Sequence, residues 1–128
     1  MVSATCDGLL GVDTSDGRLL WRVPFKTGAN RNVLTPILDG DTVNFSSHTT
    51  GFRRIRLTSV DGRLEAKDEW FNRDIRINLS TPVLVGEHFY GIGPDATKSL
   101  YCIDRRTGQV AWVQSGFGLV GAGVTDGE

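Results

Sequence analysis

Residues 102–112 read CIDRRTGQVAW, and residues 11–21 read GVDTSDGRLLW. Each stretch carries an aspartate, a glycine four positions later and a tryptophan four positions after that. The residues are Asp13, Gly17 and Trp21 in the first copy and Asp104, Gly108 and Trp112 in the second. A spaced phrase that occurs twice around different residues indicates an internal repeat, which constrains the fold more than a single motif does.

A second pair of phrases gives the period of the repeat. TPILDGDTV at 35–43 is echoed by TPVLVGEHF at 81–89, at an offset of 46 residues. The turn glycines keep the same interval, since Gly62 lies 45 residues after Gly17 and 46 before Gly108. Near the C-terminus, VTDGE at 124–128 resembles the start of one more copy. The sequence therefore predicts units of about 45 residues.

Each unit is predicted to form four short strands. In the best-preserved unit these are PVLV at 82–85, HFYGIG at 88–93, SLYCID at 99–104 and QVAWVQ at 109–114, with polar or glycine-containing turns between them. No stretch shows helical periodicity with caps over about ten residues. Four antiparallel strands per unit describe a β-propeller blade, so we expect an all-β, partial propeller.

The middle unit follows this plan less closely. Around its turn glycine it has Thr58 and Ala66 where the other copies have aspartate and tryptophan, and Trp70 comes four residues later. We expect either a longer fourth strand or a tryptophan that fills the same space from a different turn.

The repeated aspartate, glycine and tryptophan have structural roles in this interpretation. An aspartate before a tight turn accepts hydrogen bonds from the backbone N–H groups that follow, and a glycine supplies the positive φ angle. A tryptophan at a fixed distance from the turn provides an apolar surface of roughly 150–250 Å². We expect Trp21 and Trp112 to pack between neighbouring blades rather than to form a platform for a ligand.

The sequence resembles the PQQ-like β-propeller repeat, also called the quinoprotein dehydrogenase-like repeat. The resemblance rests on the Asp-x-x-x-Gly-x-x-x-Trp phrase after a unit that opens with Thr-Pro, although Gly11 and Cys102 stand where the family usually has alanine. It implies that 1–128 is one partial domain of about two and a half blades. The parts are the end of one blade (1–26), a degenerate blade (33–71), a better blade (79–115) and the start of the next (119–128). It also implies docking of each tryptophan on the adjacent blade, and a periplasmic or other extracytoplasmic location.

The composition of the 128-residue chain fits this interpretation. Sixteen glycines suit a protein of strands and tight turns, and a net charge of −1 gives no attraction for nucleic acid. No apolar run approaches the roughly 20 residues of a membrane span, and the N-terminus does not look like a signal peptide. Cys6 and Cys102 match no metal or redox spacing, so two buried free thiols are favoured over a disulfide.

Two classes of function are considered. By the resemblance, a PQQ- and Ca²⁺-dependent alcohol or sugar dehydrogenase would need an aspartate base and often adjacent cysteines. This sequence has no adjacent cysteines and no calcium-loop spacing, so such an active site would lie in blades outside this chain. We favour a non-catalytic scaffold that binds the remaining blades of a larger bacterial propeller or another protein, without catalytic residues, cofactor or metal.

Three other features have plainer explanations. GFGLVG at 116–121 matches a dinucleotide-binding glycine pattern, but no helix and acidic residue follow as such a site requires, so we interpret it as a loop between blades. His48 and His88 lack supporting metal ligands in the sequence. Arg53, Arg54 and Arg56, of which the last two share a strand face, could bind carboxylates or phosphates. We favour instead a solvated strand edge protected from pairing with another chain.

Overall fold

The computed structural model describes residues 1–28, 32–93 and 98–118, which form eleven β-strands in three antiparallel sheets. The predicted all-β fold of propeller-like blades is confirmed. Within these ranges there is no helix, and so none that could cross a membrane. The predicted start of a further blade at 119–128 lies outside the described residues.

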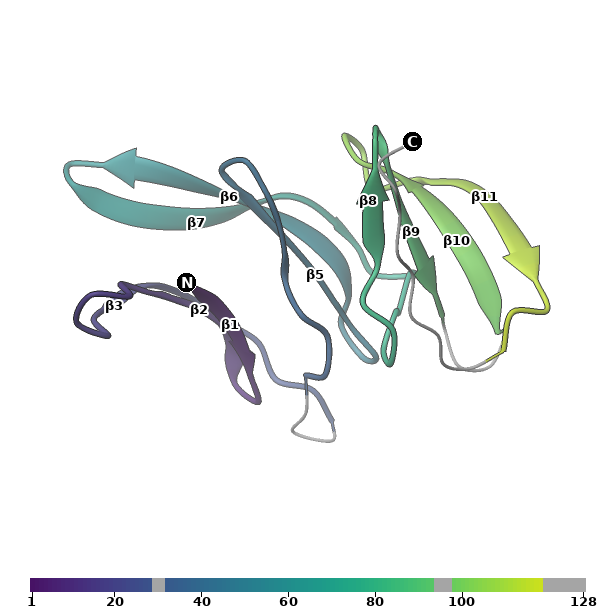
Figure 1. The fold of residues 1–128 in the computed structure, drawn as a ribbon, viewed down its shortest axis with the longest axis horizontal. Helices are drawn as coiled ribbons and strands as arrows, with labels where there is room; N and C mark the ends of the chain where they lie inside the picture. The colour runs from purple at the N-terminus through teal and green to yellow at the C-terminus, as the bar shows by residue number, and fades with distance from the viewer. Residues whose placement is uncertain (29–31, 94–97, 119–128) are drawn as a thin grey trace.

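The three sheets follow one another along the chain. The first has the order β1 (Val2–Thr5), β2 (Gly8–Val12) and β3 (Leu19–Pro24). The second has the order β4 (Ile37–Asp39), β5 (Thr42–Ser47), β6 (Gly51–Val60) and β7 (Arg63–Asn72). The third has the order β8 (Val83–Val85), β9 (His88–Ile92), β10 (Ser99–Asp104) and β11 (Val110–Ser115). Figure 1 shows the second sheet between the first (purple) and the third (green to yellow).

The last hairpin has the same register in all three sheets. Across this hairpin Trp21 pairs with Gly11, Trp70 with Arg54, and Trp112 with Cys102. A β-bulge follows the paired residue in every case. Trp70 is therefore the structural equivalent of the other two tryptophans. Of the two explanations that the sequence offered for its late position, the longer strand is right.

Beyond the bulge, the hairpin of the middle sheet is longer than the others. β6 and β7 stay paired as far as Val60 and Arg63, and a two-residue turn at Asp61 and Gly62 closes it, with φ angles of 50° and 77°. Two successive positive φ angles are typical of a type I′ turn, which suits the twist of a hairpin. The hairpin extends toward the first sheet (Figure 1), where β7 contacts β3.

The first and third sheets close the same hairpin with the Asp-x-x-x-Gly turn. The N–H of Gly17 donates to the carbonyl of Asp13 at 2.9 Å, and that of Gly108 to the carbonyl of Asp104 at 2.8 Å. The carboxylate of Asp104 also accepts from the backbone N–H of Thr107 at 2.7 Å and from its hydroxyl at 2.9 Å. Both glycines have positive φ angles, 75° and 70°. This is the hydrogen bonding that the phrase predicts.

The core lies between the sheets and contains a compact aromatic cluster. The ring of Phe52 lies 5.2 Å from that of Phe89 and 5.3 Å from that of Trp70, both edge to face. Such contacts contribute about 0.5–1.5 kcal/mol each beyond the burial of area. β5 is buried along its whole length, as expected of an inner strand with neighbouring sheets on both faces.

Gly11 gives a direct test of this packing. A Cβ atom at Gly11 would overlap the indole of the buried Trp21, so Gly11→Val should lower the free energy of unfolding by about 1–3 kcal/mol. Gly28→Val is the matched control, because nothing lies within 4 Å of a Cβ atom there, and should cost less than about 0.5 kcal/mol. Urea unfolding followed by circular dichroism measures both. Equal losses would contradict the packing of Trp21 on Gly11.

Candidate functional site

The best-defined polar site is the junction where Trp70 of the second sheet meets the turn of the third. The indole Nε1–H of Trp70 donates a 2.9 Å hydrogen bond to the carbonyl oxygen of Arg105. The side-chain amide of Asn72 donates one of 2.8 Å to the carbonyl oxygen of Gly108. A Cβ atom at Gly108 would overlap the ring of Trp70. Gly108 is therefore needed both for its positive φ angle and for the close approach of the indole.

An ion-pair network continues from the same turn. The Nε of Arg105 lies 3.1 Å from Oδ2 of Asp39, and the same oxygen accepts from Nη2 of Arg54 at 2.8 Å. Because Asp39 is in β4 and Arg54 in β6, this carboxylate joins two strands of the second sheet to the turn of the third. Glu87 lies 3.4 Å from Nη1 of Arg105.

Arg54 is the buried centre of this network. Its residue exposure is 6%, and its other donors bind Oε2 of Glu69 at 2.8 Å and Oδ1 of Asn44 at 3.1 Å. β6 lies between β5 and β7 and is not an edge strand. The predicted solvated edge is therefore wrong for Arg54. Alternating basic and apolar residues cannot distinguish a face open to water from one covered by a neighbouring sheet.

The other two arginines of the predicted cluster are more exposed and are also paired. Arg56 lies on the same face of β6 as Arg54, and both bind Glu69. Nη1 of Arg56 also lies 2.5 Å from Oδ1 of Asp41. Arg53 binds both carboxylate oxygens of Asp68, at 2.9 and 2.5 Å. The three arginines thus do not form one surface: two belong to the junction and Arg53 to the opposite side of the strand.

Glu69 stays ionised within the network. Burial raises its pKa, but hydrogen bonds from Arg56 and Arg54 outweigh this effect, so the pKa lies below its usual value. The hydrogen bond from Arg56 to Glu69 in turn raises the pKa of that guanidinium. Groups with these shifts keep their charges at neutral pH, and their ion pairs join β6 to β7 and to the β4–β5 turn within the second sheet.

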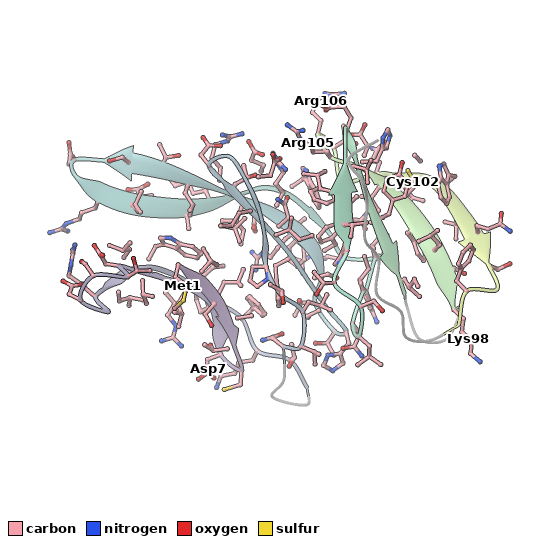
Figure 2. The ribbon with its side chains drawn as sticks, viewed as in Figure 1. Met1, Asp7, Lys98, Cys102, Arg105 and Arg106 are labelled. Carbon is pink, nitrogen blue, oxygen red and sulfur yellow. The ribbon has the colours of Figure 1, made fainter. Side chains whose placement is uncertain are left out.

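The surface at this junction is hollowed, and both signs of charge line it. The hollow measures about 490 Å³ and is lined by Arg54, Arg56, Glu69, Glu87, Arg105 and Arg106. Figure 2 shows Arg105 and Arg106 at one end of the third sheet, with Lys98 at the other. Three of the four arginines in this lining, Arg54, Arg56 and Arg105, already bind carboxylates, so the hollow is mainly a junction held by ion pairs.

The predicted docking residues differ in their surroundings. Trp21 is 6% exposed and belongs to the core, whereas Trp112 is 45% exposed, with its ring 5.9 Å from that of Tyr90. In the part of the chain that the structure describes, Trp112 does not dock on another sheet as Trp70 does, so its docking stays a prediction. The sequence left the place of Trp70 open between two explanations, because the copies were aligned on the turn glycine and not on the bulge.

The remaining candidates form no metal centre among the described residues. No three His, Cys, Asp or Glu side chains there lie close enough together to hold a metal ion. Both cysteines are free thiols, and the predicted burial is right for Cys102 and wrong for Cys6, which is exposed. The two histidines belong to different sheets, since His48 follows β5 and His88 is in β9. The ring centroid of His88 lies 6.4 Å from that of Tyr90.

Comparison with known families agrees with this geometry. The family model described as outer membrane protein assembly factor BamB, a model of PQQ-like repeats, matches residues 2–114, a range that spans all three sheets. No curated protein matches the chain.

Trp70 and Trp112 form a matched pair for mutation. Trp70→Ala should lower the free energy of unfolding by about 3 kcal/mol, because it removes packing against Phe52 and leaves the carbonyl of Arg105 without its donor. Trp112→Ala removes the same atoms at the equivalent position and should cost less than about 1 kcal/mol. Guanidinium chloride unfolding compares the two. A loss at Trp112 that equals or exceeds the loss at Trp70 would contradict the assignment of the junction.

The turn of the third sheet predicts a dependence on pH. Hydrogen bonds from Thr107, backbone first and then side chain, lower the pKa of Asp104. A carboxylate with a lowered pKa stabilises the fold above its unfolded-state pKa of about 4, and this stabilisation is lost as pH falls through the folded-state value. Asp104→Asn should therefore be less stable than the original protein at pH 7, and the difference should shrink at pH 3.

Thermal unfolding at the two pH values measures this difference. Asp61→Asn, in the turn of the middle hairpin, is the control and should change stability little at either pH. A difference between Asp104→Asn and the original protein that is the same at pH 7 and pH 3 would show that the Asp104 carboxylate does not stabilise the turn.

Proposed function

The chain belongs to the family of the outer membrane protein assembly factor BamB, and on this basis we propose that it is a non-catalytic scaffold whose third sheet docks on another β-sheet. The family is named after a factor that assembles outer membrane proteins, which supports a role in binding proteins and a location outside the cytoplasm. The observation that carries the proposal is the set of exposed apolar residues on the edge strand β11.

β11 presents an apolar surface to solvent. All six of its residues are exposed, among them Val110, Trp112 and Val113 at 39%, 45% and 47%. Phe117, just beyond the strand, is 49% exposed. β11 is also the last strand of its sheet, with β10 on one side. Trp112 and Val113 are successive strand residues and point to opposite faces, so β11 exposes apolar side chains on both of its faces. Several exposed apolar side chains on one edge strand mark an interaction surface.

Trp70 shows what kind of surface Trp112 fits. The two tryptophans hold equivalent positions in the register, and Trp70 packs on a turn that offers a backbone carbonyl and a glycine. Trp112 presents the same indole N–H and the same ring. The partner that we propose therefore carries a glycine-containing turn with a free carbonyl, in a further blade of the same propeller or in another protein.

The described residues give the alternative, part of a PQQ- and Ca²⁺-dependent dehydrogenase, no support. Calcium takes roughly six to eight oxygen ligands. The carboxylates of Asp39 and Glu69, which lie close together at the junction, are already bound to arginines. Moving Asp39 to an ion would remove one of the two carboxylates that balance the buried Arg54 and would also release Arg105. These residues do not fit the cofactor and its ion, so we assign no catalytic step to them.

Self-association of the purified chain tests the scaffold proposal. Light scattering over a dilution series should show reversible association through the exposed apolar residues of β11. Trp112→Lys with Val113→Lys should shift this association to at least about tenfold higher concentration. Leu38→Lys with Val60→Lys places the same charges on two exposed apolar positions elsewhere and should have little effect. A chain that is monomeric throughout, or equal effects of the two variants, would contradict the proposal.

Titration with PQQ and Ca²⁺ tests whether this chain itself binds the cofactor. We expect no saturable quenching of tryptophan fluorescence in the purified chain. Tight, saturable quenching would favour the dehydrogenase.

A further inference from the structure

A second hollow lies between the first and second sheets, away from the junction and from β11. Its volume is about 460 Å³. Its lining residues belong to the end of β3, the β5–β6 turn, the strands β6 and β7, and the segment after β7. The lining residues are Pro24, Phe25, Thr49, Thr50, Arg53, Phe71, Arg73 and Arg76. The hollow thus has three arginines, two aromatic rings and no carboxylate in its wall.

One of the three arginines is fixed and neutralised. Arg53 binds both oxygens of Asp68, and its side chain is 12% exposed. Its guanidinium carbon also lies 4.6 Å from the ring centroid of Phe71 and 5.8 Å from that of Phe25. Arg53 therefore holds the aromatic wall in place, and its charge is already balanced.

The other two arginines are held near the wall without a balancing charge. The guanidinium carbon of Arg73 lies 4.5 Å from the ring centroid of the same Phe71. Nε of Arg76 lies 3.5 Å from the carbonyl oxygen of Arg73. Within residues 1–28, 32–93 and 98–118, neither guanidinium has a carboxylate within salt-bridge distance, in contrast to Arg54, Arg56 and Arg105 at the other junction. Stacking orients the donors of Arg73 and leaves them free to bind.

We propose that this hollow binds an acidic segment of a partner protein. Guanidinium groups bind carboxylates through paired N–H donors, and the stacking on Phe71 reduces the freedom lost on binding. An exposed arginine binds a single carboxylate weakly, so affinity requires several carboxylates on one chain. Pro24 and Phe25 add an apolar wall for the side chains between them. The net charge of −1 disfavours a long polyanion such as nucleic acid.

Fluorescence anisotropy with a labelled peptide of six glutamates tests this proposal. The original protein should bind the peptide in low salt, and binding should weaken as salt is added. Arg73→Gln with Arg76→Gln should weaken binding at least about tenfold, because both unpaired guanidinium groups are lost. Arg22→Gln with Arg63→Gln removes the same charge from two exposed positions outside the hollow and should change binding less than about twofold.

Further binding measurements with other ligands and a control variant identify the class of ligand. A six-residue glutamine peptide should not bind, and citrate should compete only weakly, since it cannot span the hollow and reach the apolar wall. Trp112→Lys should leave peptide binding unchanged, which separates this site from the face of β11. The proposal is overturned if the original protein does not bind, if the two double variants weaken binding equally, or if a single-stranded hexanucleotide binds more tightly than the peptide.

Discussion

The hydrogen bond from Trp70 Nε1 to the carbonyl of Arg105 is the contact on which the arrangement of the second and third sheets depends. A partly buried indole needs an acceptor, and a backbone carbonyl in a tight turn supplies one in a fixed position. The indole can reach this carbonyl because the turn carries glycine at Gly108, where a side chain would overlap the ring. The tryptophan of one repeat thus packs directly on the glycine of the next, and this contact sets the spacing of the two sheets.

The ion pairs of Asp39 help to fix how the turn of the third sheet is oriented on the second sheet. One carboxylate oxygen binds Arg54 of its own sheet and Arg105 of the next, so the turn that receives the indole is also held by charge. Buried ion pairs contribute little net stability, but a broken one leaves an uncompensated charge that disfavours other arrangements. The aromatic cluster stabilises the junction, and the ion pairs specify how the two sheets align.

Much of this architecture could be predicted from the sequence, because it repeats. The period of about 45 residues, the strands of the third sheet and the turns at Asp13 and Asp104 follow from local turn chemistry and from alternation. The sequence left the equivalence of Trp70 open between two explanations, because the middle hairpin is extended beyond a bulge that leaves no mark in the sequence. The burial of Arg54 was missed for another reason, since its partners on β4 and β7 come close only when the sheet has formed.

Hydrogen exchange of the tryptophan indole groups tests the account most directly. In ¹⁵N NMR spectra of the chain, recorded at concentrations where it is monomeric, the Nε1–H of Trp70 is hydrogen-bonded and should exchange at least about tenfold more slowly than that of Trp112. Rapid exchange at Trp70 together with protection at Trp112 would contradict the account, because the sheets would then be joined by a different tryptophan.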